Sequence, residues 1–165
     1  MSIRSVIKIQ CAQIRSLDLS NGEGVGVALF VQGCHFHCFN CFNPETWDFN
    51  GGKEWTEEVK NKFFELANRP YIKRISILGG EPLAKENLED ILDLVNEIRP
   101  SFPRKSSWLY TGYDWDHIFN PQWNSHLQNH ENLYTCRLKR QQIVSLCDVL
   151  IDGRYVDSQK DITLK

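Results

Sequence analysis

The chain has 165 residues, a length that suits one domain with a hydrophobic core. Its 19 Lys and Arg residues nearly balance 21 Asp and Glu residues, so the formal net charge is −2. Composition therefore gives no electrostatic reason to expect nucleic acid or an anionic membrane as a partner. The first residues lack the apolar core of a signal peptide, so we expect a reducing, cytoplasmic setting in which the six cysteines form no disulfide framework.

The first third of the chain contains a clear strand pattern. Apolar residues between positions 5 and 20 predict a short strand followed by irregular chain, and the turn-forming run 21–24 closes this segment. Residues 25–31 are apolar at nearly every position, which is typical of a strand buried on both faces of a parallel sheet. This apolar run is far too short to span a membrane. Residues 45–54 have the glycine and polar content of a connection.

Two helices are predicted on either side of a second buried strand. Apolar spacing predicts the first helix over residues 57–67. Residues 72–78 then read as a strand that ends in Gly79-Gly80-Glu81-Pro82. The second helix follows, with Asn87 as its predicted N-cap and Pro100 as its end.

The last part of the chain adds strands at 108–111 and 149–151 and a weaker helical pattern at 139–146. Strands that alternate with helices predict an α/β fold with a mostly parallel sheet. Right-handed crossovers bring the carboxyl ends of parallel strands to one edge, where four chain segments should meet and form one site. These segments are residues 33–43, 79–81, 111–113 and 152–154.

Three cysteines in the first of these segments carry the strongest chemical signal. Three residues separate Cys34 from Cys38, and two separate Cys38 from Cys41. Thiolates are soft ligands, and three of them on one loop provide three corners of a single metal centre. The remaining cysteines show no such spacing and are expected to be structural thiols: Cys11, Cys136 and Cys147.

Two kinds of metal centre suit this loop. A structural zinc site would need a fourth ligand, either His35, His37 or a distant residue, but closed zinc sites commonly combine two paired half-sites and the sequence offers no second pair. An iron–sulfur cluster held by three thiolates leaves one iron without a protein ligand, where a substrate binds. We favour the cluster and place both histidines outside the ligand set.

The cysteine spacing, with Phe42 directly after the last cysteine, resembles the signature of the radical S-adenosylmethionine (radical SAM) superfamily. Gly79-Gly80-Glu81-Pro82 at a strand end is similar to the Gly-Gly-Glu motif of the same superfamily. The resemblance implies an incomplete TIM-like βα barrel over residues 1–165, with a 4Fe-4S cluster whose fourth iron binds SAM. Its Gly-Gly-Glu motif suits this role, because glycines let the backbone approach a ligand and a carboxylate accepts a hydrogen bond from an ammonium group.

Within the superfamily, the chain most resembles the activating proteins of anaerobic (class III) ribonucleoside-triphosphate reductases. The matching runs are Asn21-Gly22-Glu23-Gly24, Leu29-Phe30-Val31-Gln32-Gly33-Cys34, Cys41-Phe42-Asn43-Pro44-Glu45-Thr46-Trp47, Tyr110-Thr111-Gly112-Tyr113 and Val149-Leu150-Ile151-Asp152-Gly153-Arg154-Tyr155. Members of this family usually continue into a Gly-Ser-Ser-Asn-Gln-Arg-like segment, whereas this sequence reaches Lys165 without it. The resemblance therefore leaves the role of such a tail open.

This resemblance implies an enzyme that activates the large subunit of a glycyl-radical reductase. An external one-electron donor such as flavodoxin reduces the cluster, SAM is cleaved to methionine and a 5′-deoxyadenosyl radical, and that radical takes a hydrogen atom from a glycine of the reductase. The cluster and SAM carry the chemistry, so no side chain is assigned as catalytic. The implied metal ligands are Cys34, Cys38 and Cys41, and the implied cofactor contacts are Asn40, Cys41, Phe42, Gly79, Gly80, Glu81 and Thr111.

Two other functions remain as alternatives. A short radical SAM enzyme that acts on a small molecule, similar to a deazapurine synthase, would share the cluster motif. A zinc-binding interaction module would account for the cysteines without any enzymatic reaction.

Overall fold

The computed structural model describes residues 9–120 and 131–161 of the chain. Within these residues, six strands form one sheet in the order β3-β1-β2-β4-β5-β6. Strands β2, β4, β5 and β6 run parallel, whereas β1 pairs antiparallel with both β2 and β3. The fold is therefore α/β with a mostly parallel mixed sheet, which confirms the fold class predicted from the alternation of strands and helices.

The elements have the following bounds. The strands are β1 (Gln10–Asp18), β2 (Gly26–Val31), β3 (Lys53–Glu54), β4 (Arg74–Gly79), β5 (Ser106–Tyr110) and β6 (Val149–Ile151). The helices are α1 (Glu57–Ala67), α2 (Leu88–Ser101), α3 (Trp115–Phe119) and α4 (Glu131–Ser145), with short 3₁₀ helices η1 (Pro44–Thr46) and η3 (Asp157–Gln159).

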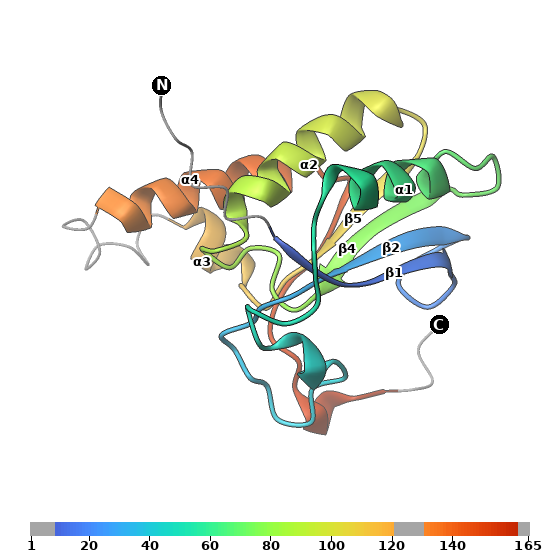
Figure 1. The fold of residues 1–165 in the computed structure, drawn as a ribbon. Coiled ribbons are helices and arrows are strands. Elements are labelled where there is room, and N and C mark those ends of the chain that lie inside the picture. Colours follow the sequence, from blue (N-terminus) through green and yellow to red (C-terminus); the bar gives the residue numbers. More distant parts are fainter. Residues whose placement is uncertain (1–8, 121–130, 162–165) are drawn as a thin grey trace.

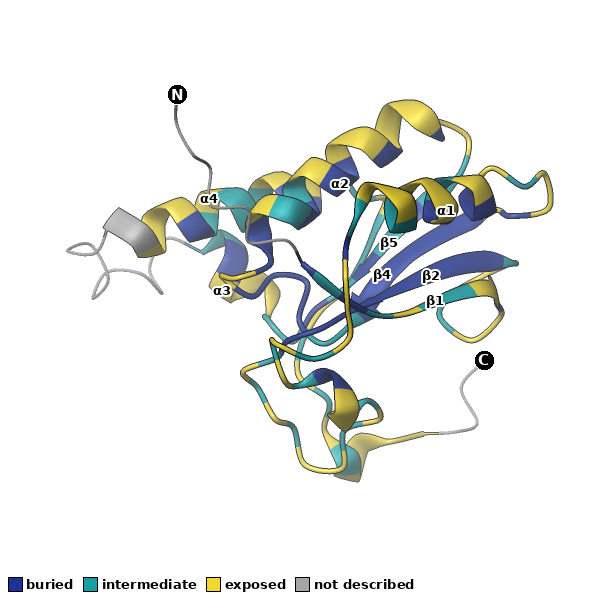
Figure 2. Cartoon of the chain, in the orientation of Figure 1, coloured by how far each residue is buried: buried dark blue, intermediate teal, exposed yellow. Residues whose placement is uncertain are grey.

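The core lies between the sheet and the helices on one of its faces. Figure 1 shows α1 and α2 lying along that face, and Figure 2 shows that their outward surfaces are exposed while β2 and β4 are buried. All six residues of β2 are buried, as predicted for a strand with both faces covered. On the opposite face of the sheet, a smaller buried cluster contains Ala28, Phe30 and Leu78.

Strand β1 differs from the prediction of a short strand followed by irregular chain. It extends over nine residues, and its register against β2 shifts between Cys11 and Gln13 and again between Arg15 and Asp18. Bulges of this kind break the two-residue alternation of side chains, so the pattern could not be read as a continuous strand. Residues 5–8 of the predicted segment lie outside the described residues.

The helices also depart from the predictions in three places. Pro100 lies inside the last turn of α2 rather than after it. Helix α4 begins well before the predicted start at Lys139, and its apolar side chains follow no clear helical stripe, which explains the weak pattern. The short helix α3 was not predicted. Within the described residues, none of the helices combines the length and apolarity that crossing a membrane requires.

Candidate active site at the carboxyl ends of the parallel strands

The ends of β2 and β4 are joined by backbone hydrogen bonds. The Gly80 N–H donates to the Val31 carbonyl at 2.8 Å, and the Glu81 N–H donates to the Gly33 carbonyl at 2.7 Å. A Cβ atom on Gly80 would lie only 2.5 Å from the Gly33 oxygen, a distance that real Cβ atoms essentially never show. Glycine at position 80 thus lets the two strand ends approach this closely. The root of the cysteine segment and the Gly79-Gly80-Glu81 run therefore form one unit.

The carboxylate of Glu81 joins β4 to the end of β5. Its Oε1 atom accepts hydrogen bonds from the Thr111 hydroxyl at 2.7 Å and the Leu83 N–H at 2.8 Å. Its Oε2 atom accepts one from the Gly112 N–H at 2.7 Å. Only 2% of the residue is exposed. Burial raises the pKa of Glu81 above its ordinary value, even though these three hydrogen bonds favour the charged form.

The segment after β6 completes the edge. The Thr111 N–H donates to the Ile151 carbonyl at 2.9 Å, and the Gly153 N–H donates to the Tyr113 carbonyl at 3.2 Å. Further along, the guanidinium of Arg154 lies 4.4 Å from the centre of the Phe36 ring in the cysteine segment. The four segments expected to converge at this edge are therefore in contact with one another, which confirms that prediction.

The cysteine segment is a tight loop that leaves the end of β2 and is tied to the chain around η1. The Cys34 N–H donates to the Trp47 carbonyl at 3.0 Å. Further on, the Cys41 N–H donates to the Cys38 carbonyl at 3.1 Å. Asn40 lies between these two cysteines in the left-handed region with φ of 53°, a conformation that asparagine tolerates better than most residues. All three cysteines are half-buried.

The donor set fits an iron–sulfur cluster. Three thiols are carried on one loop, and the backbone N–H of Asn43 lies 3.4 Å from the Cys41 sulfur, the kind of hydrogen bond that tunes such clusters. Burial raises the pKa of the Cys34 thiol, and nearby Glu81 and Cys38 act in the same direction. Within the described residues, no three His, Cys, Asp or Glu side chains are already grouped as a metal site.

The two histidines of the loop have partners other than the cysteines. The Nε2 atom of His35 lies 3.0 and 3.1 Å from the two carboxylate oxygens of Glu86, and its ring packs against Phe49. The ring of His37 stacks on Trp47 with 4.5 Å between centroids. Whether either histidine belongs to the ligand set stays a prediction.

Residues after β6 lie against the distal part of the cysteine loop. The Asn40 side chain donates to Asp157 at 3.1 Å, and the rings of Phe42 and Tyr155 pack with 4.9 Å between centroids. The ammonium group of Lys160 also lies 4.9 Å from the centre of the Phe42 ring. Two candidate cofactor contacts, Asn40 and Phe42, are thus held by a segment that sequence reasoning did not connect with them.

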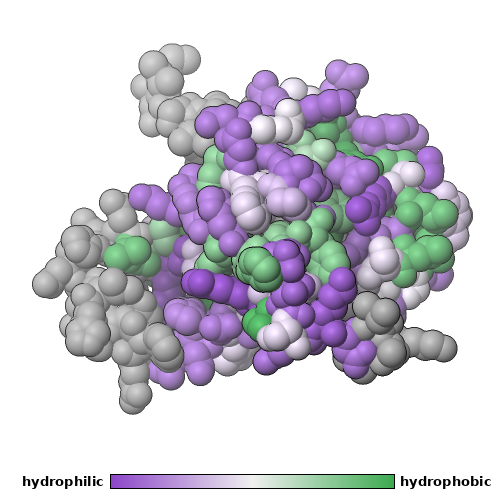
Figure 3. All heavy atoms as spheres, turned by 90° about the horizontal axis from the view of Figure 1, so that it is seen from below, coloured by the Kyte–Doolittle hydropathy of each residue, from purple (hydrophilic) through white to green (hydrophobic). Residues whose placement is uncertain are grey.

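Phe39 and Phe42 nevertheless remain largely open to solvent, with 78% and 64% of their surface exposed. Figure 3 shows hydrophobic side chains gathered near the middle of the lower face, with hydrophilic ones around them. Exposed aromatic rings next to candidate metal ligands leave the loop accessible to another molecule.

The other cysteines behave as structural thiols, as predicted. Cys11 and Cys136 are buried. Burial raises the pKa of Cys11 to about 11 and that of Cys147 to about 12, so both thiols stay protonated and unreactive near neutral pH. Asp152, at the end of β6, accepts a hydrogen bond from the Trp115 N–H at 2.7 Å.

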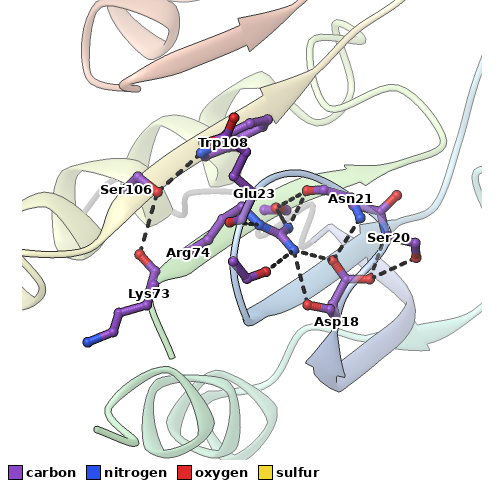
Figure 4. Close-up of polar contacts among 10 residues, drawn as sticks. Asp18, Ser20, Asn21, Glu23, Lys73, Arg74, Ser106 and Trp108 are labelled. Carbon is purple, nitrogen blue, oxygen red and sulfur yellow. Dashed lines mark hydrogen bonds and ion pairs between the residues drawn. The ribbon is translucent and has the colours of Figure 1, made fainter. Parts of the chain in front are cut away.

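The amino-terminal edge of the sheet contains a separate polar network, which Figure 4 shows. Arg74 is fully buried and forms an ion pair with Asp18, with Nη2 and Oδ2 2.9 Å apart. Arg74 also donates to the backbone carbonyls of Asn21 and Glu23 in the loop between β1 and β2. Burial alone would raise the pKa of Asp18, but hydrogen bonds from Arg74 and Asn21 hold it below its ordinary value.

Comparisons with known proteins agree with the chemistry of the carboxyl edge. A family model described as a 4Fe-4S single cluster domain matches residues 20–165. The chain is 36% identical to the anaerobic ribonucleoside-triphosphate reductase-activating protein of Escherichia coli (strain K12), over 92% of this chain and 88% of that protein. It is 31% identical to the protein of the same name from Vibrio cholerae serotype O1 (90% and 86% covered) and 32% identical to that of Enterobacteria phage T4 (87% and 79% covered).

Proposed function

The chain belongs to the family of anaerobic ribonucleoside-triphosphate reductase-activating proteins, and from this premise we propose that it activates such a reductase by generating a glycyl radical in it. The observation that carries the proposal is the junction between the cysteine loop and the Gly79-Gly80-Glu81 run. Hydrogen bonds from the Glu81 N–H to the Gly33 carbonyl and from the Gly80 N–H to the Val31 carbonyl hold the proposed metal ligands and the proposed SAM-binding turn side by side. A metal centre and its substrate need this proximity.

The residues of this chain have defined tasks in the proposed reaction. Cys34, Cys38 and Cys41 would hold a 4Fe-4S cluster, and one iron without a protein ligand would remain available to SAM. When bound, this pair supplies reductive cleavage of the SAM carbon–sulfur bond, giving methionine and a 5′-deoxyadenosyl radical that takes a hydrogen atom from a glycine Cα of the reductase. An external one-electron donor such as flavodoxin supplies the electron.

Residues at the carboxyl ends of β4 and β5 and just beyond them line the methionine end of SAM in this proposal. The turn at Gly79 and Gly80 packs against β2 and Gly33 on the side where a Cβ atom would lie, and Glu81 and Thr111 lie beside this turn. The Glu81 carboxylate already accepts three hydrogen bonds from Thr111, Leu83 and Gly112, so most of its acceptor capacity serves the protein. We therefore assign the carboxylate mainly to holding the backbone of this turn in place.

The far side of the loop receives the adenine part of SAM. Phe42 offers a ring face for it, and Asn40 and Cys41 complete this side of the site. The contacts of Asn40 with Asp157 and of Phe42 with Tyr155 limit how far the loop can move.

We further propose that the parallel strands form part of the incomplete barrel of radical SAM enzymes, built from residues 1–165 as one domain. The reducing cytoplasm suits such a cluster.

One experiment tests the proposed function directly. The protein is reconstituted with iron and sulfide without oxygen, then incubated with a reductant, SAM and a candidate anaerobic reductase. We expect a glycine-centred doublet on the reductase in electron paramagnetic resonance (EPR) spectra, together with 5′-deoxyadenosine. The Cys38→Ala variant should lose the cluster and both signals, because a missing thiolate ligand leaves a second iron unheld. Cys147→Ala is the matched control, since its thiol lies outside the loop, and it should keep both signals.

Three outcomes would contradict the proposal. Iron content in Cys38→Ala equal to that of the parent would remove Cys38 from the ligand set. One bound zinc and no acid-labile sulfide in the parent would indicate a structural metal site instead. Formation of 5′-deoxyadenosine without any radical on the reductase would favour a small-molecule substrate.

A further inference from the structure

Asn87 has an unusual position at the start of α2. The sequence predicts it as the N-cap, and it does precede the first helical residue, Leu88. Its backbone is nevertheless helical, with φ of −96° and ψ of −16°, and its side chain makes no capping hydrogen bond. Typical N-cap residues have extended backbone and use the side chain to bond the first turn. Asn87 therefore occupies the predicted N-cap position, but its side chain does not cap the helix. The residue is buried, with 3% of its surface exposed.

The side chain of Asn87 bridges the two motifs of the site. Its Nδ2 atom donates to the Gln32 carbonyl at 3.1 Å and to the Glu81 carbonyl at 2.9 Å. Gln32 directly precedes the glycine before Cys34, and Glu81 ends the Gly-Gly-Glu run. A carboxamide has two N–H donors in one plane, so both of its donors are used. One side chain thus donates to a buried carbonyl at each of the two strand ends, and the Glu81 carbonyl also accepts the Ala84 N–H at 3.1 Å.

This bridge closes a ring of hydrogen bonds at the root of the cysteine loop. On one side of the ring, the Glu81 N–H donates to the Gly33 carbonyl. On the other side, the Asn87 side chain donates to the carbonyls of Gln32 and Glu81. The Gln32 side chain extends the ring to η1, because its Nε2 atom donates to the Glu45 carbonyl at 2.9 Å. The spacing between the two motifs is thereby fixed from both sides.

From this geometry we propose that Asn87 is a positioning residue for the site. The inference rests on the proposed function, in which SAM spans from a cluster on the cysteine loop to the turn at 79–81. Such a ligand requires a constant distance between the two. Asn87 sets that distance without touching the ligand, through the carbonyls of Gln32 and Glu81.

Two substitutions separate positioning from helix capping. Asn87→Ala removes both bridging donors. Asn87→Ser supplies a good N-cap residue, so α2 keeps its start, but the shorter side chain cannot reach both carbonyls. The matched control is Asn96→Ala on the same helix, where an exposed carboxamide donates to the Leu92 carbonyl at 2.9 Å. If Asn87→Ala fails to fold, Asn87→Ser carries the test.

The readouts are SAM affinity, the EPR spectrum of the reduced cluster with and without SAM, and amide hydrogen exchange in the chain without cluster. We expect Asn87→Ser to bind SAM on the order of tenfold more weakly and to cleave it roughly a hundredfold more slowly, since displacement of a positioned group by about 1 Å has effects of this size. The spectral change on SAM addition should also shrink. Amides of Cys34 and Glu81 should exchange faster, whereas Asn96→Ala should match the parent in every readout.

The two possible failures are distinguishable. A parent protein that neither holds a cluster nor binds SAM would refute the proposed function, and the exchange rates of Cys34 and Glu81 would still test the bridge. A parent that binds and cleaves SAM, with Asn87→Ser equal to it in affinity, spectrum and exchange, would overturn the positioning role alone. A lower melting temperature with unchanged SAM affinity would also overturn it, because that result indicates a purely structural residue.

Discussion

Strand β4 has a buried carboxylate near each end, and the two have opposite surroundings. At its amino end, Asp18 is bonded to the guanidinium of Arg74, so its pKa is held below the ordinary value. Beyond its carboxyl end, Glu81 accepts hydrogen bonds from two backbone N–H groups and the Thr111 hydroxyl, all of them neutral, and burial raises its pKa. Asp18 is therefore bonded to a cation at the amino end of β4, whereas Glu81 has no bonded cation beyond the carboxyl end.

This difference separates a structural network from a candidate site. The Arg74 guanidinium bonds both Asp18 and the loop carbonyls, which leaves little capacity for a ligand. Around Glu81, the cation Arg140 lowers the pKa through space but donates to the Leu83 carbonyl and the Tyr113 hydroxyl instead. SAM, which we propose binds at this edge, carries a sulfonium and an ammonium group, and these positive charges would favour the charged form of Glu81.

The largest expected effect comes from breaking the amino-terminal network. Arg74→Met leaves the Asp18 carboxylate buried and unpaired, which should lower the free energy of unfolding by about 3–5 kcal/mol. Urea unfolding of the chain without cluster measures it. The double variant Arg74→Met/Asp18→Leu should recover part of this loss, because it removes the buried charge but leaves the carbonyls of Asn21 and Glu23 without the Arg74 donor. The control is Arg15→Met, which removes a guanidinium that lies over the Phe30 ring and makes an exposed hydrogen bond. This variant should change the free energy of unfolding little. A single variant as stable as the parent would contradict the structural role.

The next effect concerns the carboxyl edge. Glu81→Gln keeps the shape but turns an N–H group towards a neutral donor, Gly112 or Leu83, so roughly 1–3 kcal/mol of stability should be lost. Weaker SAM binding should accompany this loss, as it should for Glu81→Ala. Equilibrium SAM binding and urea unfolding measure the two effects. Glu97→Gln is the control, since this exposed carboxylate pairs with Lys60 at the surface, where ion pairs contribute little. An unchanged SAM dissociation constant would exclude a role of Glu81 in the site.

The smallest effect is a change in how stability depends on pH. Asp18 contributes stability that is present above pH 3.8 and is lost as the pH falls through its lower folded pKa. Glu81 has the opposite sign, because its contribution is present below pH 4.5 and is lost as the pH rises through its higher folded pKa. Asp18→Asn should therefore flatten the acid side of the stability profile, and Glu81→Gln the side above pH 4.5. Profiles that change on the same side in both variants would show that the two carboxylates are not electrostatically opposite.

Much of the candidate site could be predicted from local sequence. The apolar strand 25–31, the strand ending at Gly79 and the strand 149–151 follow from composition and turn residues, and the parallel sheet brings their ends together. The spacing of the three cysteines indicates an iron–sulfur cluster because the ligands lie on one loop. Short-range patterns of this kind need no knowledge of the rest of the fold.

The remaining features depend on contacts between distant parts of the chain. Asn40 and Asp157 are 117 positions apart, and Asn87 bonds Gln32 across 55 positions. A local pattern gave Asn87 the role of a helix cap, but its buried side chain donates to the carbonyls of Gln32 and Glu81 instead. Burial without a partner costs more than a lost cap, so tertiary packing decided its bonds.

The sequence by itself determined which segments reach the carboxyl edge and what chemistry the cysteines suit, since strand order and ligand spacing are properties of short runs of residues. Only the tertiary structure decided how those segments are held relative to one another. Glu81 and Asn87 hold them through hydrogen bonds that form only where the sheet brings buried donors and acceptors within reach, and no sequence spacing encodes that distance.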